Sequence, residues 1–247
     1  MTARYYTMNV FLWALISAPF IQQDSIEKKL LNYKCNKEIP SVIERQTLIA
    51  LSHYPELKNT RIRFIFTRKL KRSVMAARPM ISSLLKKREK RTYDVLINPV
   101  FKLEHSFETI RQIPDSVMIG WIGHELGHIM DYESKSTWGI LGFGISYGFS
   151  KKFIRKAERI ADRFAVERGL GEHLVATKSF ILDHTELPLA YQEKIAALYL
   201  SPDDIVELVA ELETEEDENK KEKRLLKEEN VIHEAESELN EGQAPAS

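Results

Sequence analysis

Residues Gly120–Asp131, with the sequence Gly-Trp-Ile-Gly-His-Glu-Leu-Gly-His-Ile-Met-Asp, decide the interpretation of this 247-residue chain. They contain the pattern H-E-x-x-H within an apolar segment that is typical of a buried helix. Residues four apart lie on one face of an α-helix, so the imidazoles of His124 and His128 can point at one ion. Glu125 is rotated by about 100° from His124 and stands beside that ion, where a base can take a proton from metal-bound water. The sequence therefore predicts a metal-binding helix that carries its own catalytic base.

A second acidic motif, E-x-x-A-D, lies downstream in the predicted helical segment Ala157–Val166. Its Glu158 and Asp162 are four residues apart and share one helix face. Glu158 is a candidate third zinc ligand, and Asp162 is a candidate acceptor for the free N–H of a zinc-bound histidine. Two histidines, one glutamate and a water form a catalytic zinc set with one open position. Asp131 remains a rival for the third ligand because it follows His128 by three residues on nearly the same face.

Together the two motifs resemble those of the gluzincin metallopeptidases, in particular the group of heat-shock membrane proteases and CAAX prenyl endopeptidases. The likeness covers roughly residues 90–170, and its specific part is HELGH followed by E-x-x-A-D. It implies that His124, His128 and Glu158 bind one Zn2+ ion per chain. It also implies that Glu125 is the general base and that Asp162 supports a ligand from outside the coordination shell. The expected substrate is a peptide or protein, and its sequence preference is left open.

The chemistry expected of these residues is zinc-dependent hydrolysis of peptide bonds by a metal-activated water, as in an endopeptidase. The competing interpretation is a zinc-stabilised binding or scaffold protein without catalytic activity. A structural zinc site has no use for a base and is usually closed, so the intact Glu125 favours the enzyme. No spacing identifies the residue that would stabilise an oxyanion, and the candidates are His53, His105, His173, His184, His233, Tyr147 and Tyr191.

Outside the motifs, the pattern of apolar residues predicts an α+β, mainly helical fold. A small antiparallel or mixed sheet is expected to pack on the HExxH helix and on the second, ExxAD helix. Residues 61–67 and 92–98 alternate between apolar and polar side chains, as strands do. The strand at 92–98 is either an exposed edge that pairs with a substrate peptide or an ordinary sheet strand. Residues 75–87 indicate no more than a helical turn or two near Met80 to Leu85.

Signals for helix ends and for close packing divide the helical part of the chain. Pro114, Asp115 and Ser116 offer a start for the HExxH helix, and Gly169 offers an end for the second one. Gly123 and Gly127 cost helix propensity, which indicates that another element approaches closely there. Further helices are expected at residues 25–33, from Pro40, at 171–182, at 187–200 and from Ser201.

Composition separates the two ends of the chain from its middle. The apolar run at residues 8–20 suits a secretory signal peptide or a buried N-terminal helix, so residues 1–23 are set apart. Residues 24–210 are expected to form the metallopeptidase-like domain. Residues 211–247 are an acidic tail, either an exposed helix or disordered. Export or membrane attachment is favoured over a cytoplasmic location.

Formal net charge is zero but unevenly distributed along the chain. Residues 61–91 hold twelve Lys or Arg against one acidic residue, and residues 211–241 hold thirteen Asp or Glu against five Lys or Arg. A solvated basic face and a solvated tail explain both, and a membrane-surface patch is the sharper alternative. No aromatic-interleaved RNA motif or DNA-reading helix is present, so no nucleic-acid partner is expected. The single Cys35 excludes an intramolecular disulfide and a cysteine-based metal site.

An apolar run at residues 138–149 contains four glycines, at 139, 142, 144 and 148. It is too short to cross a bilayer as a helix, which takes about 20 residues. Close helix packing or a buried connection is the favoured interpretation. A re-entrant membrane loop and an active-site flap are the alternatives.

Overall fold

The computed structural model describes residues 26–70, 73–102, 107–140, 142, 150–183, 187 and 189–241, with the side chains at 101, 102, 107, 108, 225 and 228–241 left out. The predicted signal segment and most of the glycine-rich run therefore lie outside the described residues. The chain divides into two compact units, Met1–Ile205 and Val206–Ser247, and each is considered by itself. The first unit contains every residue of both motifs.

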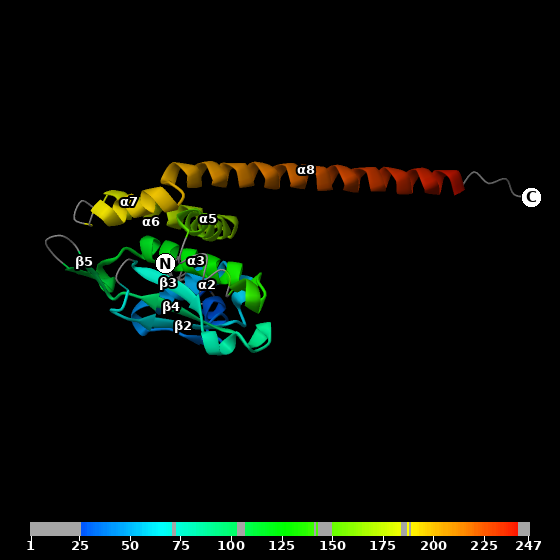
Figure 1. The fold of residues 1–247 in the computed structure, drawn as a ribbon. Coiled ribbons are helices and arrows are strands. Elements are labelled where there is room, and N and C mark those ends of the chain that lie inside the picture. The colour runs from blue at the N-terminus through cyan, green and yellow to red at the C-terminus, as the bar shows by residue number, and fades with distance from the viewer. Residues whose placement is uncertain are drawn as a thin grey trace, which may run out of the picture. The chain divides into compact units, whose positions relative to one another are not determined.

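The HExxH segment lies in helix α3 (Asp115–Glu133), which forms the centre of the first unit. All its residues from Val117 to Ile129 are buried. Helices α5 (Lys151–Glu167) and α6 (Gly171–Asp183) pack on one side of α3, while α2 (Glu44–Ser52) and the sheet pack on the other, as Figure 1 shows. A helix buried on several faces shows no single apolar stripe, and this explains the nearly continuous apolar sequence of α3.

Glycines on α3 allow its neighbours to approach closely, as predicted. A β-carbon at Gly127 would overlap the backbone of Ala161 in α5, and a Leu170 methyl group fills the space over Gly123. Because Ala161 lies one turn from Glu158, the approach at Gly127 is what brings the E-x-x-A-D motif to the histidines.

The main sheet has four strands in the order β1-β2-β4-β3 and is mixed. β2 pairs in parallel with both β1 and β4, whereas β3 runs antiparallel to β4. A separate antiparallel pair, β5 and β6, follows. Together with the helices, this sheet confirms the predicted α+β, mainly helical fold class. The strands are β1 (Lys37–Glu38), β2 (Arg61–Phe66), β3 (Met75–Pro79), β4 (Thr92–Ile97), β5 (Val100–Lys102) and β6 (Phe107–Thr109).

The structure decides two points about this sheet that the sequence left open. Residues 75–79 form strand β3, and only the short 3-10 turn Ile81–Ser83 remains of the expected helical turn. The sequence Met-Ala-Ala-Arg-Pro has too few large apolar residues to alternate, so its strand character comes from pairing with β4. Of the two alternatives for residues 92–98, the ordinary sheet strand is correct, because β4 lies between β2 and β3. The free edge beside α3 belongs to β3, which contacts α3 directly.

The remaining helices begin and end largely where their sequence signals lie. Gly169 has a φ of 78° directly after α5, so it forms the predicted left-handed end. Ser201 and Asp204 exchange hydrogen bonds between side chain and backbone, which caps α8. Helix α3 begins at Asp115, within the predicted start signal, with Pro114 at the N-cap and no side-chain hydrogen bond there. These helices are α7 (Leu189–Leu198) and α8 (Pro202–Glu241), with short 3-10 turns at Ser41–Ile43, Pro55–Leu57, Arg88–Lys90 and Ile110–Gln112.

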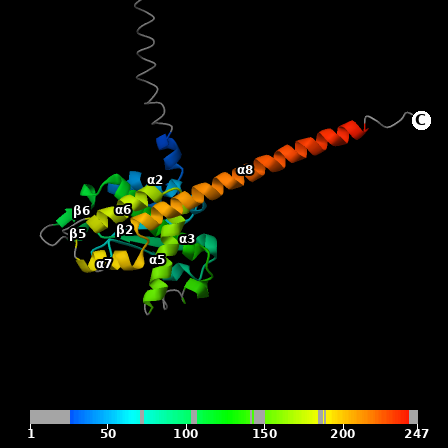
Figure 2. The same ribbon diagram turned by 90° about the horizontal axis from the view of Figure 1, so that it is seen from above.

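Helix α7 contacts both α5 and α6, and these three helices lie together in the two views of Figures 1 and 2. Residues 26–31 add one further helical segment. In the second unit the acidic sequence from residue 211 to 241 is helical, as part of α8. None of the described helices is both long and apolar enough to cross a bilayer.

Candidate metal centre

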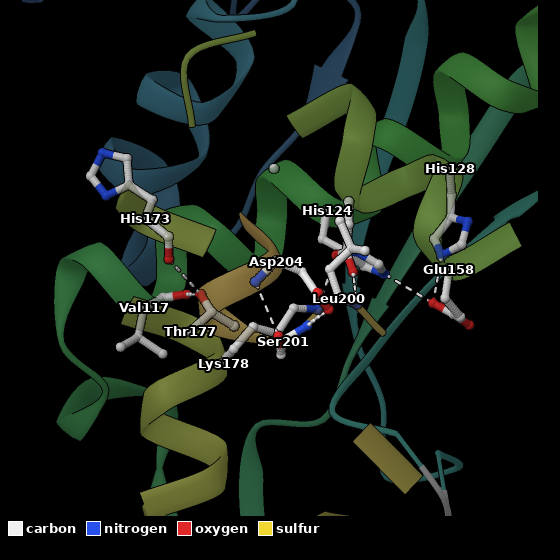
Figure 3. A network of polar contacts seen from close by, with 12 residues as sticks. Val117, His124, His128, Glu158, His173, Thr177, Lys178, Leu200, Ser201 and Asp204 are labelled. Atoms are coloured by element: carbon white, nitrogen blue, oxygen red, sulfur yellow. Dashed lines mark hydrogen bonds and ion pairs between the residues drawn. The ribbon is translucent and has the colours of Figure 1, made fainter. Parts of the chain in front are cut away.

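Three buried side chains from two helices converge in the first unit. His124 and His128 come from successive turns of α3, and Glu158 comes from α5 (Figure 3). One nitrogen or oxygen from each lies within 4.8 Å of the others. Glu158 Oε2 is 3.1 Å from His124 Nε2 and 3.2 Å from His128 Nε2. The structure thus brings together the three residues that the motifs nominated.

These donors suit a divalent metal ion. Bonds of about 2.0–2.2 Å in a tetrahedral zinc site place neighbouring ligand atoms about 3.3 Å apart. The Glu158 oxygen already lies near that spacing from each of the two imidazole nitrogens, and all three atoms lie within 4.8 Å of one another. The set of two imidazoles and one carboxylate also leaves a fourth position open. The structure therefore contains a group that can hold a metal ion.

Protons and charges in this group are strongly coupled when no metal is bound. Burial alone would lower the pKa of His124, but the Asp162 carboxylate and the hydrogen bond to Glu158 outweigh it and raise the pKa to about 9. Burial would raise the pKa of Glu158, but hydrogen bonds from His124 and His128 hold it well below its ordinary value. In the metal-free protein a protonated His124 imidazole therefore faces the Glu158 carboxylate. Its proton supplies positive charge at the position where a cation would bind.

Asp162 holds His124 from the opposite side. Its Oδ1 lies 2.8 Å from His124 Nδ1 and 2.9 Å from Lys178 Nζ, and its Oδ2 accepts the backbone N–H of Leu200 at 3.0 Å. Burial would raise the pKa of Asp162, but the Lys178 ammonium and then His124 lower it. Because His124 Nδ1 is engaged, its Nε2 is the nitrogen directed at the ion. Asp162 thus has the supporting position that the motif predicted.

Lys178 and Leu200 are parts of the site that the sequence did not reveal. Lys178 lies on α6 and is only 3% exposed, and its ammonium also stands 4.1 Å from the centre of the Tyr199 ring. Leu200 contributes its backbone N–H, and the type of residue at a position does not predict such a contact. The one signal in the sequence is the position of Lys178 among the apolar residues of its helix. A lysine that is buried there needs an acidic partner, because buried lysines are nearly always paired.

Glu125 lies beside the triad rather than in it. Its Oε2 accepts the backbone N–H of Ala77 in β3 at 2.6 Å. Burial raises the pKa of the Glu125 carboxyl, and the charges of His124 and His128 oppose this rise. A carboxylate with an increased affinity for a proton is suited to act as a general base. The role of Ala77 is not predictable from the sequence, because the sequence pattern does not predict strand β3, on which this residue lies.

A small cavity of about 20 Å3 adjoins His124 and Glu125. That volume holds about one water molecule. Tyr191 and Ile195 of α7 line it, together with Tyr199 beyond the helix end. Burial, followed by the charges of Glu125 and Glu158, raises the pKa of the Tyr191 hydroxyl, so that this group stays a hydrogen-bond donor. Tyr191 is therefore the one earlier oxyanion candidate that the structure places at the site among the described residues.

The other candidates have different surroundings. Asp131 pairs with Lys135, which lies just beyond the end of α3, and is not part of the metal-binding group. His53 Nδ1 lies 2.7 Å from the Arg168 carbonyl, and His173 Nδ1 lies 2.9 Å from Ser116 Oγ. Three candidates are outside the described residues and a fourth has no described side chain; these are His105, Tyr147, His184 and His233.

Comparisons with protein-family models, with curated proteins and with solved structures gave no match to this chain. The likeness to gluzincins thus depends on the two motifs alone.

Proposed function

We propose that this protein is a zinc-dependent peptidase of the gluzincin type. His124, His128 and Glu158 are the zinc ligands, and Glu125 is the general base. The observation that carries the proposal is the position of Glu125: a buried carboxylate with a raised pKa stands next to the metal-binding group. A purely structural zinc site needs no such group.

Each residue has a separate task in the proposed hydrolysis. A zinc ion held by His124, His128 and Glu158 would lower the pKa of water towards about 7 and would polarise the substrate carbonyl. The Glu125 carboxylate takes a proton from the water whose oxygen attacks the carbonyl carbon, and it gives this proton to the amine nitrogen as the C–N bond breaks. The Ala77 N–H orients that carboxylate, and Asp162 keeps the proton of His124 on Nδ1. The Tyr191 hydroxyl lines the same cavity and can donate to the substrate carbonyl oxygen.

Strand β3 supports a peptide as the substrate. Among the described strands of the main sheet it pairs with β4 alone, so an extended chain can pair along its other edge if it displaces the Glu125 and Tyr132 side chains that now contact the Ala77 N–H and carbonyl. Ala77 on that edge already reaches Glu125 through its N–H group. A peptide that lies along β3 would therefore place its backbone next to the base and the metal-binding group.

The proposal is tested by the variant Glu125→Gln. Glutamine keeps an oxygen that can accept the Ala77 N–H, but it cannot take up a proton. We expect hydrolysis of a peptide library to fall by about 100-fold or more while one zinc per chain is retained. Elemental analysis and cleavage detected by mass spectrometry measure the two quantities.

The matched control is Glu193→Gln, which changes an exposed glutamate of α7. It should leave both zinc content and hydrolysis at the parent level. If Glu125→Gln cleaved peptides at the parent rate, the assignment of the base would be wrong.

One observation favours a second candidate function, a zinc-stabilised binding protein. All four central side chains are at most 6% exposed, and the adjoining cavity holds about one water. A closed site of this kind is typical of structural zinc. A parent chain that binds zinc stoichiometrically, gains thermal stability from it and cleaves no member of the library would establish this alternative.

A further inference from the structure

Three large apolar side chains of the first unit are exposed away from the metal centre. Ile81 is 78% exposed, Leu85 is 92% exposed and Trp138 is 82% exposed. Large apolar groups on a protein surface are unremarkable when scattered, but a group of them marks an interaction site. The question is therefore whether these three belong to one surface.

Hydrogen bonds join the two segments that carry these side chains. Thr137 Oγ1 donates to the Leu84 carbonyl at 2.9 Å. The Arg91 guanidinium donates to the Lys135 carbonyl at 3.0 Å and to Thr137 Oγ1 at 3.2 Å. Leu85 and Trp138 directly follow the two bonded residues, Leu84 and Thr137. Leu85 and Trp138 thus leave from adjacent stretches of backbone, and Ile81 lies in the turn directly before Leu84.

Four cationic side chains lie next to Leu85 in the same segment of the chain. Lys86, Lys87, Arg88 and Lys90 follow Leu85 directly, and all four are exposed. Glu89 is the single acidic residue from position 61 to 91. Buried Leu84 and Arg91 anchor the ends of the segment in the protein, so the cations are carried by a backbone that is tied down at both sides.

We propose that this surface binds the protein peripherally to an anionic lipid bilayer. Tryptophan prefers the membrane–water interface, and leucine and isoleucine bury area among the acyl chains. Lysine and arginine beside them are attracted to anionic headgroups over about one Debye length, about 10 Å in 0.1 M salt. The interaction surface, named here the apolar-basic patch, consists of Ile81, Leu85, Trp138, Lys86, Lys87, Arg88 and Lys90.

A lipid surface fits the patch better than a protein or nucleic-acid partner does. Protein interfaces favour aromatic and arginine side chains and contain few lysines at their centres, whereas three of the four cations here are lysines. Nucleic-acid binding needs no exposed aliphatic side chains such as Ile81 and Leu85. The inference is independent of the proposed peptidase activity, because no residue of the patch belongs to the metal centre.

Co-sedimentation of the full chain with lipid vesicles tests the proposal. Vesicles of phosphatidylcholine alone are compared with vesicles of phosphatidylcholine and phosphatidylserine in equal parts, at low and high salt. We expect binding to the mixed vesicles that weakens as salt is raised. The variant with Ile81→Ser, Leu85→Ser and Trp138→Ser should bind at least about tenfold more weakly than the parent. The control Leu189→Ser removes an exposed apolar residue elsewhere and should bind like the parent.

Tryptophan fluorescence adds a test that locates the contact. Trp121 is buried and Trp13 lies outside the described residues, so insertion of Trp138 should shift the emission to shorter wavelength when mixed vesicles are added. The shift should disappear in Trp138→Phe. A shift that persists in this variant would assign the contact to the apolar N-terminal run and overturn the proposal. Unchanged binding of the triple serine variant, or a preference for an oligonucleotide or an acidic peptide over mixed vesicles, would overturn it as well.

Discussion

His124 is contacted at both ring nitrogens, and the two contacts set its response to pH. Without metal its pKa is raised to about 9, above the ordinary value of 6.5. A raised pKa in the folded state stabilises the fold fully below the ordinary value, and this stabilisation is lost as pH rises through 9. Glu158 and Asp162 have lowered pKa values, so their contributions are present above their ordinary values and are lost in acid.

These shifts predict how metal-free and zinc-loaded protein differ with pH. Metal-free protein should be most stable between about pH 5 and 6.5 and should lose several degrees of Tm by about pH 8.5. Zinc requires a neutral His124, so the rise in Tm on adding zinc should be larger at the higher pH. Melting curves of chelator-treated and zinc-loaded protein measure both trends. A zinc effect that shrinks between these pH values would contradict the assignment of His124 as a ligand.

Lys178 neutralises a buried carboxylate, and its removal has a predictable cost. The variant Lys178→Met keeps the length of the side chain but leaves Asp162 without its ammonium partner. Breaking a buried ion pair on one side costs about 3–5 kcal/mol, so urea unfolding of metal-free protein should show a loss of this order. Zinc restores positive charge next to His124, so the loss should be smaller in zinc-loaded protein. Lys156→Met, an exposed change on α5, should be neutral in both forms; equal losses for the two lysines would refute the pairing.

At the scale of helices, the contact between α3 and α5 determines whether the third ligand reaches the histidines. In Gly127→Ala the new β-carbon would overlap the backbone of Ala161, which lies one turn from Glu158. We expect a loss of about 1–3 kcal/mol in stability and a zinc affinity reduced by about tenfold or more. Isothermal titration with zinc measures the affinity.

Gly142→Ala provides the control for this change. A β-carbon at Gly142 meets no atom within 4 Å, so alanine there should leave zinc affinity unchanged. Equal zinc affinity in Gly127→Ala and in the parent would show that α5 can shift without moving Glu158.

The helices and the sheet differ in how far the sequence predicts them, for a physical reason. The sequence predicts the site residues in pairs. His124 and His128 are four residues apart in one helix, and Glu158 and Asp162 are four apart in another, so each pair shares one helix face. Strand β3 is not, because its short side chains carry no alternation and its pairing with β4 is a tertiary contact. The same limit applies to the backbone N–H groups of Ala77 and Leu200, which any residue except proline could supply.

At the scale of the whole molecule, the first unit contains the complete metal-binding group and its supporting contacts. Its last residues are part of that support: Leu200 donates to Asp162, and Ile205 is fully buried. The first turn of α8 therefore belongs functionally to the domain, although most of the helix lies in the second unit. The helix continues through the acidic segment without any break in its hydrogen-bonded structure up to Glu241.

This division predicts opposite results for two truncations of α8. A chain that ends at Ala210 keeps Leu200, the Ser201–Asp204 cap and Ile205, so we expect zinc content and Tm to match those of the full chain. A chain that ends at Tyr199 loses the N–H donor to Asp162 together with the buried Ile205. Burial of an isoleucine side chain alone contributes about 1.5–3 kcal/mol, so this chain should melt many degrees lower and bind zinc more weakly. Should the chain ending at Ala210 lose zinc to the same extent as the shorter one, the acidic part of α8 would be a required component of the metal centre, and the first unit would not be sufficient to form it.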